Sequence, residues 1–239
     1  MNDVMNPYDR RARLYPMVVV LLPLALGVAV WIPAGVKIPG MIGSAVVMLA
    51  TSALLTQLAR DQGKRREKEL FRLWGGRPSD RALSYSSRTF AEATLTRWHK
   101  KLLELEPNLR IPESMSAERA DPKGAKGAYA AATDLLVAKT RDKGTYPMLF
   151  RENMNYGFRR NLWGMKAIGI TTSLLGLAAA GAKIVLLALD SEPQELVPFV
   201  ALGSCIVLLG VWIGRVTAAW VRVPAEGYAK HLAEACETL

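Results

Sequence analysis

The residues best suited to chemistry lie in the stretch Arg151–Lys166, directly before a long apolar run. If this stretch is helical, one of its faces combines a carboxylate, two guanidinium groups and two aromatic rings. The residues of this face are Glu152, Tyr156, Arg159, Arg160 and Trp163. One interpretation is a membrane anchor, with the rings at headgroup depth and the arginines on lipid phosphates. The other is a site for an anionic ligand, because guanidinium groups pair with phosphate through two hydrogen bonds.

Four apolar runs are long enough to cross a membrane as helices, for which about 20 residues are needed. The first contains Pro23, which we expect to bend the helix without ending it. The runs are Tyr15–Ile32, Met41–Leu58, Ala167–Leu189 and Leu196–Ile213. The sequence therefore predicts an all-α membrane protein with four transmembrane helices in two hairpins, and a helical cytoplasmic insert between the second and third helices.

The net charge of +10 is concentrated in that insert. From Arg60 to Lys166 there are 23 Lys and Arg against 13 Asp and Glu, whereas the rest of the chain holds 8 of each kind. Because basic residues favour the cytoplasmic side of a membrane, both termini and the insert are predicted to be cytoplasmic. The predicted parts are a cytoplasmic leader (1–14), a transmembrane hairpin (15–58), a basic helical domain (59–166), a second transmembrane hairpin (167–215) and a cytoplasmic C-terminal helix (216–239).

Within the basic domain, glycines and prolines mark the expected helix ends. The helix of the second apolar run is predicted to continue as far as Gly75-Gly76, because no strong breaker precedes them. A new helix is predicted to start at Ser79-Asp80. An amphipathic helix ending at Pro107 is predicted from the spacing of five side chains: Phe90, Thr94, Trp98, Leu102 and Leu105.

The remaining segments are predicted from the same signals. The Pro- and Gly-containing region 107–127 is predicted to be a surface loop, and residues 128–142 a helix. Pro147 is predicted to open the helix that enters the membrane, since proline is favoured in the first turn. Residues 224–239 are predicted to form a short terminal helix.

Polar side chains on the second and third apolar runs favour one of two roles. They can hydrogen-bond between packed helices, which is their usual role in lipid, or they can line a pore. A lysine on the same face can also extend its ammonium group to the membrane surface. The candidate pore-lining residues are Ser44, Thr51, Ser52, Thr172, Ser173 and Lys183.

Patterns typical of catalytic and metal centres are absent from the sequence. The two cysteines and two histidines have no metal-ligand spacing, and no HExxH or GxSxG motif is present. The stretch Gly75–Arg81 is Gly-rich and basic but lacks the Lys-Ser/Thr of a phosphate-binding loop, so we interpret it as a turn and a helix cap. The four apolar runs contain no Asp or Glu, which argues against a proton-coupled transporter. We therefore expect a protein that is not an enzyme and has no metal or cofactor.

The run from Thr140 to Asn161, TRDKGTYPMLFRENMNYGFRRN, followed by an apolar segment, resembles a group of bacterial antiphage-defence proteins. These are transmembrane effectors associated with nucleotidyltransferases, of which the Hailong-type channel effectors are an example. The resemblance implies a protein of the bacterial inner membrane that conducts ions or disrupts the membrane under control of a nucleotide or oligonucleotide. It also implies a nucleotidyltransferase of the same system as a partner. The ligand-binding residues that it nominates are Asn153, Tyr156, Arg159, Arg160 and Asn161.

Two functional hypotheses follow. The first is a homo-oligomeric channel or pore, because four helices enclose too little space for a wide pore in one copy, with an insert that senses an anionic ligand. A basic insert with interleaved aromatic residues suits nucleotide phosphates and bases, and it equally suits anionic lipid headgroups. The second hypothesis is a non-conducting membrane anchor or scaffold that recruits a soluble partner through the insert.

Overall fold

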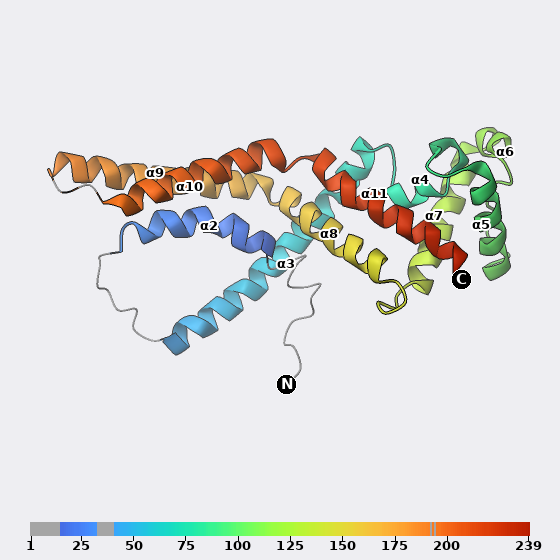
Figure 1. Ribbon diagram of the computed structural model, residues 1–239, viewed down its shortest axis with the longest axis horizontal. Helices are drawn as coiled ribbons and strands as arrows, with labels where there is room; N and C mark the ends of the chain where they lie inside the picture. Colours follow the sequence, from blue (N-terminus) through green and yellow to red (C-terminus); the bar gives the residue numbers. More distant parts are fainter. Residues whose placement is uncertain (1–14, 33–40, 192, 194) are drawn as a thin grey trace. The chain divides into compact units, whose positions relative to one another are not determined.

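Every regular element that the structure describes is a helix, which confirms the predicted all-α class (Figure 1). This computed structural model describes residues 15–32, 41–191, 193 and 195–239, and for residues 41–53 and 55 it describes the backbone alone. The predicted leader 1–14 and the predicted turn 33–40 lie outside the described residues. The α-helices are α2 (Tyr15–Ala29), α3 (Met41–Leu73), α4 (Pro78–Ala82), α5 (Glu92–Leu105), α6 (Met115–Ala120), α7 (Pro122–Lys139), α8 (Pro147–Gly164), α9 (Lys166–Leu189), α10 (Leu196–Gly210) and α11 (Ala218–Glu234).

The chain divides into two compact units. The first, here the apolar unit, comprises Met1–Glu67 and Gly157–Val221. The second, here the polar unit, comprises Lys68–Tyr156 and Arg222–Leu239. Three helices, α3, α8 and α11, contribute residues to both units.

Two of the described helices are long and apolar enough to cross a membrane. They are α9, with 24 residues, and the 20-residue segment Leu196–Arg215, in which α10 continues into the π-helix η3 (Val211–Arg215). Helix α2 is apolar but has only 15 residues. The structure thus supports two of the four predicted spans, and the other two remain a prediction. As expected, Pro23 lies inside α2 without ending it.

Helices α2, α9 and α10 pack side by side in the apolar unit, and glycines allow the closest approaches (Figure 1). A Cβ atom added to Gly27 of α2 would lie 2.8 Å from Cα of Gly176 in α9. A Cβ atom on Gly176 would overlap the carbonyl oxygen of Pro23, and one on Gly169 would overlap the ring of Trp212. Close backbone contact is the usual means by which helices associate in lipid, where burial of apolar surface gives little driving force.

Helix α3 runs without interruption from Met41 to Leu73, as predicted. It ends at Gly75 and Gly76, whose φ angles of 76° and 137° are readily adopted only by glycine. Glycines also allow α3 and α8 to approach closely: a Cβ atom on Gly164 of α8 would lie only 2.7 Å from the Gly63 nitrogen of α3, and one on Gly63 would overlap the side chain of Asn161. The same helix therefore serves as an apolar segment and as a packing partner of α8.

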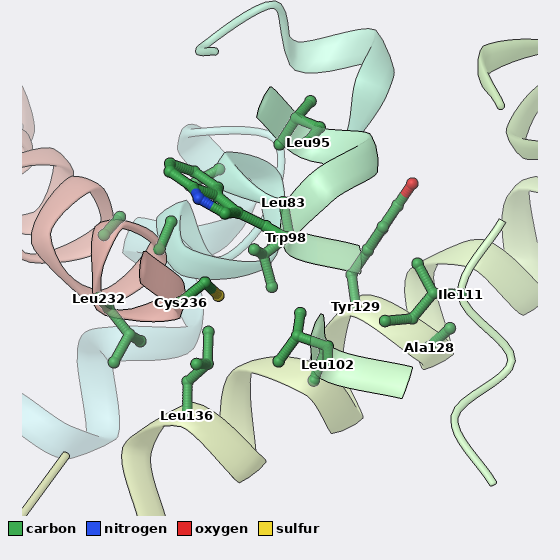
Figure 2. Close-up of a cluster of buried hydrophobic side chains, with 14 of the residues drawn as sticks. Leu83, Leu95, Trp98, Leu102, Ile111, Ala128, Tyr129, Leu136, Leu232 and Cys236 are labelled. Atoms are coloured by element: carbon green, nitrogen blue, oxygen red, sulfur yellow. The ribbon is translucent and has the colours of Figure 1, made fainter. Parts of the chain in front are cut away.

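The polar unit has a hydrophobic core of its own, to which α5, α7 and the C-terminal segment contribute (Figure 2). Figure 2 shows the side chains of Trp98, Leu102, Leu136 and Leu232 converging. The predicted face of α5 was partly wrong, because Leu95 and His99 are buried beside Trp98 and Leu102, while Leu105 is exposed. The buried face is therefore turned slightly from the predicted stripe.

The predicted loop 107–127 was wrong in its second half. Helix α6 occupies Met115–Ala120, and α7 begins at Pro122 instead of residue 128. The side chain of Asp121 accepts a hydrogen bond from the Gly124 N–H at 2.9 Å, so an N-cap followed by proline starts the helix despite the two glycines in its first turns. At the other end α7 stops at Lys139 and does not reach residue 142.

Two further helix boundaries differ from expectation. Helix α8 begins at Pro147 as predicted, but α8 and α9 are separate helices that meet at Met165. The terminal helix α11 starts at Ala218, within the predicted C-terminal part 216–239, and it contains Pro224, which the local sequence signals made the first residue of a short helix.

Candidate functional site

The two arginines nominated from the sequence contact different helices of the apolar unit. Arg159 donates from Nη1 to the carbonyl oxygen of Trp220 in α11 at 2.9 Å, and its guanidinium group lies 4.8 Å from the centroid of the Trp220 ring. Arg160 donates to Glu67 in α3, with 2.7 Å between Nη1 and Oε1. Adjacent positions on a helix point about 100° apart, so the two side chains reach different neighbours.

The other nominated residues are distributed over the two units. Asn161 is buried in the apolar unit, where its side chain occupies the space left by Gly63. Asn153 and Tyr156 belong to the polar unit. Asn153 lines a small recess of about 210 Å³, together with Lys143 and Tyr228. The structure therefore does not gather the five residues within either unit, and their role in ligand binding remains a prediction.

Trp163, for which the sequence allows a position among lipid headgroups, is instead buried in the apolar unit. The guanidinium carbon of Arg66 lies 5.7 Å from its ring centroid, a cation–π contact with α3. Intramolecular packing is thus a third role for this face of α8, besides the anchor and the ligand site.

Of the candidate pore-lining residues, Thr172 and Ser173 are buried within one copy of the chain. Thr172 Oγ1 donates to the Val20 carbonyl oxygen of α2 at 2.7 Å, and Ser173 Oγ donates to Gly169 within its own helix at 2.8 Å. Lys183 Nζ lies 5.8 Å from the centroid of the Trp31 ring. The side chains of the remaining three candidates, Ser44, Thr51 and Ser52, lie outside the described residues.

A cavity of about 470 Å³ lies in the polar unit. It is formed by the turn after α3, by α4, by the 3-10 helix η2 (Tyr85–Ser87), and by α6 and α7. We call it the serine–arginine pocket. Its polar lining consists of Arg77, Asp80, Arg81, Ser84, Ser86, Ser87, Glu118, Arg119, Lys126 and Tyr129.

A buried carboxylate organises one wall of this pocket. Glu118 accepts hydrogen bonds from the Ser84 hydroxyl at 2.6 Å, from the Tyr85 N–H at 2.8 Å and from the Tyr129 hydroxyl at 2.8 Å, and it also accepts one from Ser86. Burial by itself would raise the pKa of Glu118, but these donors outweigh it and hold the pKa below its ordinary value. Burial and the bond to Glu118 raise the pKa of Tyr129. The wall is therefore an ionised carboxylate surrounded by neutral donors.

The cations of the pocket fall into two groups. Arg77 pairs with Asp134 at 2.8 Å, and Arg81 donates to the Trp74 carbonyl oxygen at 2.6 Å. Arg119 and Lys126 are exposed, and neither forms a salt bridge with a residue that the structure describes. The pocket lining holds four cations against the two carboxylates Asp80 and Glu118, and burial raises the pKa of Asp80. Its electrostatic balance thus favours an anion.

The sequence interpretation missed this pocket. At the Gly75–Arg81 edge the sequence predicts only a turn and a helix cap. The turn is present at Gly75 and Gly76, but the predicted helix start at Ser79-Asp80 was wrong, because α4 begins at Pro78 and its N-cap residue Arg77 makes no side-chain cap hydrogen bond. The Ser84–Ser87 segment and Glu118 lie 31 or more positions apart, so no local spacing connects them. The one local signal is the dense run of hydroxyl residues from Ser84 to Thr89.

No group of three or more potential metal ligands occurs among the residues that the structure describes. The chain matches no protein-family model, no curated protein and no solved structure.

Proposed function

We propose that this protein is a membrane channel or pore-forming effector of bacterial defence, which acts as a homo-oligomer under control of an anionic nucleotide or oligonucleotide. The observation that carries the proposal is that one chain combines membrane-length apolar helices with a separately packed helical unit containing a cation-rich pocket. The proposal places the polar unit and both termini in the cytoplasm, in keeping with the concentration of basic residues there.

The polar unit has the properties that a ligand sensor requires. Its core, shown in Figure 2, belongs to that unit alone, so the serine–arginine pocket is built on a packed scaffold. The pocket volume of about 470 Å³ falls within the roughly 300–1,000 Å³ that is usual for small-molecule sites. Charge-assisted hydrogen bonds from Arg and Lys are the strongest that a protein offers to a phosphate group.

The exposed apolar side chains of α9 and α10 support the proposed membrane role of the apolar unit. Leu189 and Leu196 are 74% and 76% exposed, and Val185, Val200 and Val207 are also exposed on α9 and α10. Such a surface requires lipid or neighbouring helices around it. A conducting path then forms between copies in the proposal.

One observation favours the non-conducting scaffold as a second candidate. The hydroxyl groups of Thr172 and Ser173 are used in helix packing within a single copy, which is the role expected of such residues in an ordinary membrane anchor. In this alternative, the polar unit recruits a soluble partner and the apolar unit holds the complex at the membrane.

Current across a planar bilayer separates the two candidates. Purified full-length protein is incorporated, and current is recorded before and after addition of mononucleotides, cyclic nucleotides and short single-stranded oligonucleotides. The channel proposal predicts discrete current steps whose frequency changes with at least one of these ligands. Protein that is incorporated as an oligomer but carries no current with any ligand would reject the channel in favour of the scaffold.

A further inference from the structure

The lining of the serine–arginine pocket combines two exposed cations with serine hydroxyl groups. Arg119 of α6 and Lys126 of α7 line the same cavity as Ser86 and Ser87 of η2. An ammonium or guanidinium group supplies charge to a phosphate, whereas serine hydroxyls both donate and accept hydrogen bonds. The pocket therefore presents complementary groups to a ligand that has both a phosphate and hydroxyl groups.

The two carboxylates of the pocket neutralise its four cations only in part. Glu118 is surrounded by donors from four residues, so these partners already satisfy it. Asp80 forms a salt bridge with Arg77 at 3.8 Å, and Lys126 acts on it only as a nearby charge, beyond salt-bridge distance. Arg119 contacts the Met115 sulfur at 3.3 Å, a weak acceptor that an anionic oxygen would readily replace.

The pocket does not provide what a nucleic acid strand would need. Its only aromatic lining residue, Tyr129, is 3% exposed and lies beside His99, with 5.7 Å between ring centroids. It therefore offers no open ring on which a base could stack, and base stacking is, besides the attraction of the backbone phosphates, a principal contact of single strands. The volume of about 470 Å³ also suits one small molecule.

We propose that the serine–arginine pocket binds one small phosphorylated ligand of the sugar-phosphate class, such as the phosphoribosyl part of a mononucleotide. Arg119 and Lys126 hold the phosphate. Ser86 and Ser87 donate their own hydroxyl hydrogens to Glu118 and to the Ser84 carbonyl oxygen, so their oxygens accept hydrogen bonds from the sugar hydroxyls. This inference rests on the proposed function in one respect, since it assigns the site through which the ligand would act. It narrows the ligand from nucleotides and oligonucleotides in general to a compact phosphate ester.

The test is binding to detergent-solubilised full-length protein by titration calorimetry, with AMP, ribose 5-phosphate, inorganic phosphate and a single-stranded DNA octamer as probes. We expect AMP and ribose 5-phosphate to bind more tightly than phosphate alone, and the octamer to bind no better than AMP. Arg119→Gln and Lys126→Gln should each weaken binding by about tenfold, the effect of losing one charge-assisted hydrogen bond. Ser86→Ala should weaken ribose 5-phosphate binding more than phosphate binding.

Lys123→Gln is the matched control, because Lys123 is an exposed cation in the first turn of the same helix, outside the pocket. Lys123→Gln should leave the affinity for the probes unchanged. If Lys123→Gln and Lys126→Gln weaken binding equally, the loss of affinity reflects only the lower net charge, and the pocket is not the binding site. Absence of binding by all probes, or octamer binding that the pocket variants do not alter, would overturn the ligand class. Binding that follows the predicted pattern in protein without current would support the pocket while rejecting the channel.

Discussion

Arg160 of α8 and Glu67 of α3 form an ion pair within the apolar unit, with the arginine side chain 11% and the glutamate side chain 25% exposed. The remaining edge of the guanidinium group faces Asn161 Oδ1, at 3.4 Å from Nε and 3.3 Å from Nη2. Two sides of the guanidinium group are therefore engaged within the chain. A phosphate that pairs with Arg160 through two hydrogen bonds would have to displace at least one of these contacts.

Replacement of Arg160 by lysine tests whether this residue stabilises the folded protein or binds a ligand. Lys keeps the charge but loses the planar fork, so Arg160→Lys should lower the free energy of unfolding by about 1–2 kcal/mol. The measurement is urea unfolding in mixed micelles, with Glu67→Gln and the double variant completing a thermodynamic cycle. Arg72→Lys, at an exposed position of α3, serves as the control. Unchanged stability combined with weaker oligonucleotide binding would instead assign Arg160 to a ligand site.

The long helix α3 could be predicted because its signals are local. No proline occurs between Met41 and Leu73, and the pair Gly75-Gly76 supplies the positive φ angles that end it. The start of α7 was missed although its signal is equally local. Gly124 and Gly127 favour a loop, but the cap formed by Asp121 and the proline that follows it outweighs them.

The candidate pocket could not be predicted because its parts meet only through tertiary packing. Glu118 is joined to Ser84, Tyr85 and Tyr129 by hydrogen bonds between separate helices. Sequence periodicity places residues on a face of one helix, but it does not indicate which faces meet. The same limit applies to Arg159 and Arg160, whose separate partners on α11 and α3 no sequence pattern showed.

Gly176 should be intolerant of any side chain. Gly176→Ala adds a methyl group against the Pro23 carbonyl and 2.8 Å from Cys205 Sγ, so we expect a loss of about 1–3 kcal/mol from overpacking. Gly181→Ala in the same helix meets nothing within 4 Å and should be neutral or stabilising by up to about 1 kcal/mol, the helix-propensity difference. Unfolding of both variants in mixed micelles gives the comparison, and equal stability would show that the α2–α9 contact is loose.

Glu118 should make the stability of the polar unit depend on pH in the acid range. Its pKa is lower in the folded protein than in the unfolded chain, so its stabilising contribution is present above the ordinary glutamate pKa. That contribution is lost as the pH falls through the folded-state pKa. Glu118→Gln should therefore lower stability at pH 7 and flatten the decline of stability below the ordinary glutamate pKa, measured by urea unfolding. Tyr129→Phe removes one donor and should move the midpoint of the decline to higher pH. An identical acid profile for wild type and Glu118→Gln would contradict the assigned hydrogen bonds.

Cysteine labelling should report the topology without interference from the native thiols. Cys205 and Cys236 are both buried, and burial raises the pKa of Cys236 to about 12, so neither should react with a maleimide. Ser191 and Ser116 are both exposed. In intact cells, an impermeant maleimide should label Ser191→Cys from outside and should label Ser116→Cys only after the membrane is opened. Labelling of Ser116→Cys in intact cells would reverse the predicted orientation.

Variants of Thr172 and of its neighbour Thr171 distinguish whether the Thr172 hydroxyl lines a pore or packs α9 against α2. Thr172 Oγ1 donates to Val20 of α2 at 2.7 Å, whereas Thr171 is exposed and its hydroxyl donates to Ala167 of its own helix at 3.1 Å. Valine has nearly the shape of threonine, so Thr172→Val removes the interhelical hydrogen bond with little change in volume. We expect a stability loss of about 0.6–1.7 kcal/mol for Thr172→Val, the range measured for hydrogen bonds between membrane helices, and none for Thr171→Val.

If Thr172 instead lines a pore in the assembled oligomer, its replacement should change the current through a single open channel. Single-channel recordings of both variants, alongside their unfolding curves, decide between the two roles, and a changed conductance with unaltered stability would contradict the packing role.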